Sequence, residues 1–384
     1  MHSIDVSKGS INTAVSSQWF ERPADQRFTS LSDLHEAVAL AESASREVEL
    51  QPKALKAIAS DMETLHIEAD GKLYSPTHYG FSDVAAQAKA PASYLRSVPA
   101  PLAALNLNYG LRAAEQKDRA LYVQEADNIG TLRCITSTAY GRITDREVVE
   151  AVMKVAGDGV GDTKWKVPGT IDWGGAHGVT YNPKVDVTKE NTTLFASDRD
   201  VFMFLVDDLN PIEVGKLKNG EPDLMFRGFY VWNSEVGRRT FGVATMYLRG
   251  VCQNRCLWGV EGFKEISFAH TSGAPDRFGL EAMPALESFA GGNTSKVVKG
   301  VKAAKRLRLS TNEEERIEVL TGFGFSRKQA LEMIGIATEE EGSPPESAWD
   351  YAQCITATAR RIEHQDARID MERVAGKLLD KVPA

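Results

Sequence analysis

Two neighbouring stretches of the sequence, residues 226–233 and 239–249, combine aromatic and basic side chains. Successive side chains of a β-strand point to opposite faces, so alternate positions of each stretch share a face. Aromatic rings stack on bases and guanidinium groups neutralise phosphates, a combination that predicts binding of single-stranded nucleic acid. The candidates are three arginines and four aromatic residues: Arg227, Tyr230, Trp232, Arg239, Phe241, Tyr247 and Arg249. The same residue types are common in any half-buried sheet, and that interpretation stays open.

A second candidate surface is the stretch Lys296–Arg308, which holds six basic residues and no acidic one. Lysines recur at every third position from Lys296 to Lys305, which places them along one side of a helix. Such a stripe predicts a phosphate-binding surface with these candidates: Lys299, Lys302, Lys305, Arg306 and Arg308. A solvated helix face has the same pattern, and the glutamates at 313–315 follow closely enough to neutralise it.

Paired aspartates offer a third chemistry, the binding of a divalent metal. If residues 193–206 form one strand, Asp198 and Asp200 face the same side, as a metal-dependent nuclease would need. Asp207 and Asp208, which follow, are more typical of a turn. The nuclease is therefore the least favoured hypothesis, and we predict no metal site.

Cysteine and histidine add little to these possibilities. Cys252 and Cys256 are separated by three residues, and together with His270 they would still lack a fourth zinc ligand. His270 and Asp276 could form an acid/base pair, although a lone histidine at a strand end is more often structural. The sequence contains no P-loop, dinucleotide-binding, zinc-protease or esterase motif. We therefore predict no cofactor and name no catalytic residue, and a non-enzymatic role is favoured.

Composition is that of a folded protein, with 384 residues of which 42% are hydrophobic and 26% charged. The net charge of −8 means that attraction to nucleic acid must be local. The longest apolar run, Val201–Val206, is far shorter than the roughly 20 residues that span a bilayer, so no membrane contact is expected. The first residues lack the basic and apolar segments of a secretion signal, which predicts a cytoplasmic protein.

The elements that must position these candidates follow from periodicity and turn signals. Helices are predicted over residues 30–45, over 145–156 with Asp145 as N-cap, and twice between 81 and 114. Strands are predicted over 47–51, 64–68, 193–206, 226–233, 239–249 and 264–270, with a hairpin over 121–140. Residues 167–191, rich in glycine and polar residues, are expected to form a long loop, and the chain becomes helical after about residue 276.

This order of elements predicts an α+β fold with a central, largely antiparallel sheet. An N-terminal α/β portion precedes the sheet and a helical C-terminal portion follows it. The expected divisions are a lead-in segment (1–28), the N-terminal α/β portion (29–119), a central β-rich core (120–290) and the C-terminal helical portion (291–384).

Five phrases between Trp19 and the last predicted helix carry a family resemblance. They are WFERPADQRF at 19–28, NTTLFASDRD at 191–200, GFYVWNSEVG at 228–237, VCQNRCLWG at 251–259 and HQDAR at 364–368. Together they resemble the phage and plasmid proteins grouped as domain of unknown function 932. The resemblance implies a protein of phages, plasmids or integrated elements that acts in the host cytoplasm, and it implies no reaction. The stretch 172–184 departs from the family pattern.

Mobile elements encode many nucleic-acid-binding proteins, and a sheet followed by helices is similar to the single-strand annealing proteins of phages. We therefore expect a single-stranded DNA-binding protein that promotes strand annealing in recombination or replication, assembled as a homo-oligomer. Annealing needs phosphate neutralisation and presentation of bases, and no active site. The alternative is a non-enzymatic inhibitor that binds a host defence or regulatory protein, for which a net charge of −8 would mimic nucleic acid.

Overall fold

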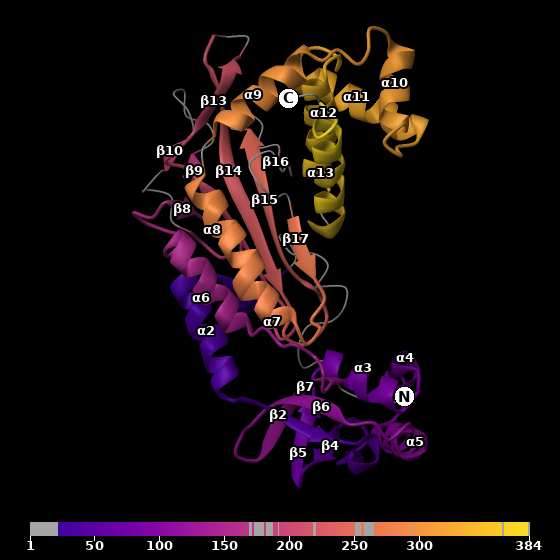
Figure 1. The fold of residues 1–384 in the computed structure, drawn as a ribbon. Coiled ribbons are helices and arrows are strands. Elements are labelled where there is room, and N and C mark those ends of the chain that lie inside the picture. Colours follow the sequence, from indigo (N-terminus) through magenta and orange to yellow (C-terminus); the bar gives the residue numbers. More distant parts are fainter. Residues whose placement is uncertain are drawn as a thin grey trace.

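The computed structural model describes residues 22–168, 171–172, 180–181, 187–190, 192–217, 220–249, 255–256, 265–292, 294–362 and 365–382. Within these ranges the chain forms two large β-sheets with helices packed around them (Figure 1). The larger sheet is antiparallel throughout, and the helices lie mainly in the C-terminal part. The predicted α+β class is confirmed.

The smaller sheet has six strands in the order β2-β6-β7-β5-β4-β3, antiparallel apart from the parallel pair β5 and β7. Its strands are β2 (Ser45–Leu50), β3 (Lys56–Ala59), β4 (Leu65–Ala69), β5 (Lys72–Pro76), β6 (Arg119–Gln124) and β7 (Ile129–Ser137). Helices α3 (His78–Gln87), α4 (Ala92–Arg96) and α5 (Ala100–Ala113) share its apolar core. Because β6 and β7 complete this sheet, it extends past the division at residue 119 that the sequence suggested.

In the described part of the chain the larger sheet has nine strands, with the path β1-β11-β12-β14-β15-β16 and three further strands paired to it. In chain order they are β1 (Arg27–Phe28), β8 (Trp165–Lys166), β11 (Leu194–Ala196), β12 (Val201–Asp207), β13 (Ile212–Lys216), β14 (Pro222–Asn233), β15 (Phe241–Arg249), β16 (Arg255–Cys256) and β17 (Glu265–Phe268). The centre is the long hairpin of β14 and β15, in which Arg227 lies opposite Tyr247 and Tyr230 opposite Ala244.

Both faces of this sheet are apolar and buried. One face packs on α2 (Leu31–Ser43), α6 (Asp145–Ala156), α7 (Ala274–Arg277) and α8 (Met283–Gly291), which lie together in Figure 1. The opposite face is rich in phenylalanine, and Ile369 of α13 (Gln365–Leu379) packs against it. Strands buried on both sides explain the unbroken apolar run Val201–Val206.

The remaining C-terminal helices are α9 (Ser295–Arg306), α10 (Glu313–Thr321), α11 (Arg327–Glu341) and α12 (Ala348–Arg360), and α9 packs on β13 and on α12. Of these helices, α9 and α12 pack at one end of the large sheet, and α11 and α10 follow outward from α12 (Figure 1). The helical end predicted from the sequence is therefore confirmed. Among the helices described, none is both long and apolar enough to cross a bilayer.

Three local predictions are wrong. Where two helices were predicted between residues 81 and 114 the structure has three, α3, α4 and α5, because Pro91 and Pro99 separate them. Residues 193–206 form two strands, because Ser197 N–H donates to the carbonyl of Asp200 (2.9 Å) and closes a turn between β11 and β12. The N-cap of α6 is Thr144, whose hydroxyl accepts from Glu147 N–H at 3.2 Å, so Asp145 is the first helical residue. The long loop expected at 167–191 lies mostly outside the described residues, which include the short paired strands β9 (Ile171–Asp172) and β10 (Thr180–Tyr181) there.

Candidate functional site

Helix α9 is amphipathic, as the lysine spacing predicts. Its apolar side, formed by Val297, Val301 and Ala304, is buried in the main core. Four basic side chains on the helix are exposed, and we call them the basic face of α9: Lys296, Lys299, Lys302 and Arg306. Burial of the apolar side therefore fixes the direction in which these cations point.

No carboxylate in the described part of the chain lies within 4.0 Å of the basic face of α9. The glutamates that could have neutralised it act elsewhere. Glu314 pairs with Arg327 of α11 at 2.6 Å, and the Glu315 carboxylate accepts the Thr311 N–H at 2.6 Å ahead of α10. The basic face is therefore an uncompensated group of positive charges on an acidic protein.

An open cleft of about 920 Å³ lies at the C-terminal end of α9. Strands β13–β15 and helices α11 and α12 supply its other walls. Its lining is strongly charged, with both signs present, and includes Lys216, Asp223, Arg249, Arg306, Glu341 and Glu346. Arg306 belongs both to the cleft and to the basic face of α9, so the two features are continuous.

Ion pairs hold most of the basic residues of the cleft. Asp223 accepts from Arg249 at 2.8 Å and from Lys305 at 2.9 Å, and Arg249 also reaches Glu341 at 2.8 Å. Burial raises the pKa of Asp223, but its bonds to Arg249 and Lys305 outweigh burial and bring the pKa below its ordinary value. Of the candidates predicted for phosphate binding, Arg249 and Lys305 are therefore already paired, and so is Arg308, which lies 2.7 Å from Glu346.

Trp349 forms the apolar part of the cleft wall. Its side chain is buried, and the Lys305 ammonium lies 5.7 Å from the centre of the ring. The buried indole Nε1–H has no acceptor among the described residues. This donor is inside the wall and not on its surface, so the cleft offers a ligand mainly its charged groups.

The sheet candidates do not form one platform. Arg227, Phe241 and Tyr247 lie on the face covered by α8, whereas Tyr230 and Trp232 lie on the opposite face. Phe241, Tyr247 and Tyr230 have no exposed surface and Trp232 is 8% exposed. Stacking on bases needs an accessible ring face, so the three fully buried rings serve the core in this structure.

The arginines among the sheet candidates also have structural partners. Arg227 donates to Asp207 at 2.8 Å and to the carbonyls of Phe289 and Gly292, which ties α8 to the sheet. Arg239 is 3.7 Å from Asp200 and keeps 21% of its side chain exposed. Of these two arginines, Arg239 is the one with accessible surface.

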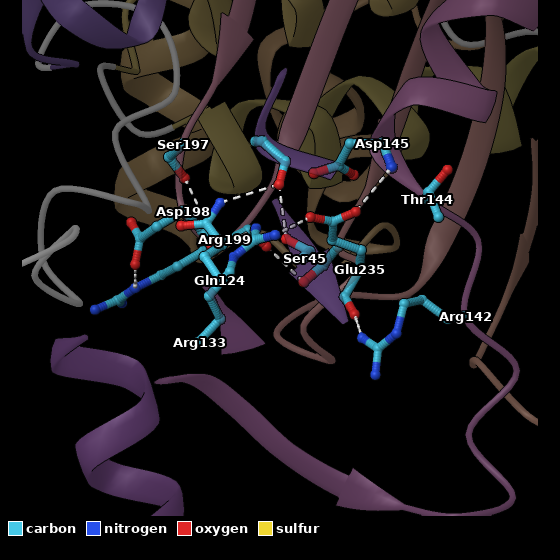
Figure 2. Close-up of polar contacts among 12 residues, drawn as sticks. Ser45, Gln124, Arg133, Arg142, Thr144, Asp145, Ser197, Asp198, Arg199 and Glu235 are labelled. Atoms are coloured by element: carbon cyan, nitrogen blue, oxygen red, sulfur yellow. Dashed lines mark hydrogen bonds and ion pairs between the residues drawn. The ribbon is translucent and has the colours of Figure 1, made fainter. Parts of the chain in front are cut away.

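A buried polar junction joins the two sheets, and sequence reasoning did not find it (Figure 2). Arg133 of β7 forms an ion pair with Glu235, which follows β14, and both side chains are 4% exposed. The second Glu235 oxygen accepts the N–H of Asp145 at 3.2 Å, and Asn233 donates to the Asp145 carboxylate at 2.8 Å. Burial, with the nearby charge of Glu235, raises the pKa of Asp145 well above its ordinary value.

The aspartates of the nuclease hypothesis lie beside this junction, in the turn between β11 and β12. Asp200 is fully buried and accepts from Arg22 at 2.7 Å, and Asp198 lies 3.9 Å from the guanidinium of Arg199. The described residues hold no group of three metal-ligating side chains. The aspartates are therefore occupied by arginines, as in a structural cluster.

Where the side chains of the histidine and cysteine candidates are described, they are buried. His270 is buried, stacks on Tyr140, and its Nδ1 lies 3.2 Å from the Gly141 carbonyl. Cys252 and the side chain of Cys256 lie outside the described residues. Cys134 and Cys354 are free, buried thiols, and burial raises the pKa of each to about 12.

Comparison of the chain with protein-family models, with characterised proteins and with solved structures finds no match.

Proposed function

We propose that this protein binds single-stranded nucleic acid, and that the basic face of α9 is where it holds the phosphates. The observation that carries the proposal is a set of four exposed cations on one helix, with no acidic partner among the described residues. The chain as a whole has a net charge of −8 and would repel a polyanion. A local set of cations without acidic partners therefore favours the binding of a polyanionic ligand at this helix.

The proposed partner is single-stranded DNA, and the proposed outcome is annealing to a complementary strand in recombination or replication. The resemblance to domain of unknown function 932, with its phage and plasmid setting, supports this choice. Assembly into a homo-oligomer and action in the host cytoplasm are further parts of the proposal. The cleft extends the binding surface beyond Arg306, and its ion pairs can exchange carboxylates for phosphates. No bond is made or broken in this function.

The test measures binding of a labelled single strand and of its duplex, at two salt concentrations, with and without magnesium. We expect salt-sensitive binding that favours the single strand. The double substitution Lys299→Glu and Lys302→Glu should weaken it roughly tenfold or more at low salt, because two phosphate contacts become repulsive.

The matched control is Lys53→Glu with Lys328→Glu, which makes the same charge change at two exposed lysines away from α9. Equal loss in both pairs would show that net charge, and not the basic face of α9, governs binding. No binding of either strand form by the wild type would overturn the proposal and favour the inhibitor of a host protein. Shortening of the probe with magnesium would favour the nuclease.

A further inference from the structure

Trp232 lies flat against the neighbouring strand because residue 242 is glycine. The two residues are opposite each other in the hairpin of β14 and β15. A Cβ atom at position 242 would lie 2.0 Å from Cζ2 of the indole, so any other residue would push the ring away. One face of the indole therefore rests on the strand backbone.

A small hollow of about 200 Å³ lies over this part of the sheet. Trp232 and Phe202 form its apolar lining, and the start of α13 closes one side with Ile369. The hollow is separate from the cleft beside α9. Its lining includes Thr240, immediately before β15, whereas Arg249 of the cleft ends β15.

Polar groups surround this apolar lining. Arg373 of α13 makes a two-pronged ion pair with Glu265 of β17, at 2.7 and 2.8 Å. Arg239 contributes a partly exposed guanidinium, and the hydroxyls of Thr240 and Ser267 lie 3.0 Å apart. The lining thus combines a little ring surface with several donors and acceptors. This combination matches a nucleobase, which has apolar faces and a polar edge.

We propose that this hollow receives one unstacked base of the bound nucleic acid, with Trp232 as its stacking partner. The inference rests on the proposed function and deepens it, since it supplies a source of preference for single strands. A cavity of ~150 Å³ accepts benzene, so the hollow has room for one heterocycle and not for a base pair. A duplex would have to break a pair and flip a base to fill it.

The hollow and the basic face of α9 then act on different parts of the ligand. The eight steps of β15 between Phe241 and Arg249 span about 27 Å at ~3.4 Å per residue. Phosphate contacts at one end and a base contact at the other require a strand that covers this distance. Binding should therefore weaken sharply for oligonucleotides too short to reach both.

The test compares two labelled single strands of equal length and charge, one with bases and one made of abasic residues. The wild type should bind the strand with bases about 5- to 150-fold more tightly, the range expected for one stacked base. Trp232→Leu should bring the affinity for this strand down to the abasic level. Trp232→Phe keeps a ring and should retain part of the preference.

The matched control is Lys299→Gln with Lys302→Gln, which should weaken binding of both strands by the same factor. Equal binding of the two strands by the wild type overturns the inference and leaves phosphate binding by α9 intact. Binding of neither strand overturns the proposed function and the inference with it. Should Trp232→Leu fail to fold, Trp232→Phe takes its place. An undiminished preference for the strand with bases in that variant would overturn the assignment of the stacked base to Trp232.

Discussion

The basic face of α9 and the polar junction between the sheets use the same residue types in opposite ways. At the junction, Arg133 is 4% exposed and is held by Glu235. On α9, Lys299 and Lys302 are exposed and have no carboxylate within 4.0 Å in the described part of the chain. The junction cations stabilise the fold, whereas the cations of α9 are available to a ligand.

This difference shows that the number of basic residues in a stretch is a poor guide to nucleic-acid binding. Whether a basic side chain can bind a phosphate depends on whether a carboxylate already holds it. Arg227 and Arg249 belong to the aromatic and basic strands that first suggested nucleic-acid binding, and both are paired with buried carboxylates, Asp207 and Asp223. A buried charge without such a partner would cost several kcal/mol. The following substitutions test the distinction, beginning with the largest expected effect.

Removing the junction cation should destabilise the fold most. Arg133→Met leaves Glu235 buried without its ion-pair partner, which should lower the free energy of unfolding by about 3–5 kcal/mol. Chemical denaturation measures this change. Adding Glu235→Gln removes the stranded charge and should restore part of the loss. A loss for Arg133→Met below about 1 kcal/mol would contradict a structural role for the pair.

A buried carboxyl of the smaller sheet should make stability depend on pH. Burial raises the pKa of Asp83 on α3 to about 7, and its carboxylate accepts the Ile135 N–H at 3.0 Å. In the unfolded chain this pKa is about 3.9, so between pH 4 and 7 the native state holds an extra proton and stability falls as pH rises. Asp83→Asn keeps the acceptor and removes the titration.

The variant Asp83→Asn should therefore gain stability over the wild type as pH increases from 5 to 8, by about 2–3 kcal/mol. Thermal unfolding at several pH values measures the difference. A constant difference across this range would mean that the Asp83 carboxyl titrates near its ordinary pKa.

Removing the carboxylate that pairs with a cation of the cleft should make that cation available to a phosphate, as the lysines of α9 are. Glu346 holds both Arg308 (2.7 Å) and Arg316 (3.2 Å), and Arg308 is 61% exposed. Glu346→Gln should strengthen binding of single-stranded DNA by about threefold at low salt, as one more cation becomes available. Glu36→Gln, at an exposed position on α2, is the matched control, and an equal gain there would leave only net charge as the cause.

The sequence predicted α9 well because its signals are local. Lysines at intervals of three, with valines between them, specify an amphipathic helix whatever it packs against. The strands β14 and β15 were equally predictable from the sequence, since each is a long apolar stretch in which residue types alternate. Local periodicity thus located the candidate surface and most of the elements around it.

Periodicity could not say which sheet face is covered. Alternation placed Tyr247 and Arg249 on one face, and only the registration of β14 against β15 puts Tyr230 and Trp232 on the other. It also missed the turn at residues 197–200, where serine and aspartate side chains interrupt an apolar stretch.

The polar junction could not be predicted from the sequence because its residues are distant from one another along the chain. Arg133 and Glu235 are 102 residues apart, and neither belongs to a recognisable motif by itself. The phrase that includes Asn233, Ser234 and Glu235 is one of those that carry the family resemblance, and in the structure all three residues are buried at the junction. A distinctive phrase can therefore mark a structural joint as readily as a functional site.

The most direct test of the central claim is the salt dependence of single-stranded DNA binding. The double substitution Lys299→Gln and Lys302→Gln removes two charges from the basic face of α9, and each phosphate contact contributes about 0.7 to the slope of log K against log salt. We predict a slope shallower than that of the wild type by about 1.4, while Lys53→Gln with Lys328→Gln leaves it unchanged. An unchanged slope in the α9 variant would contradict the assignment of phosphate binding to this helix.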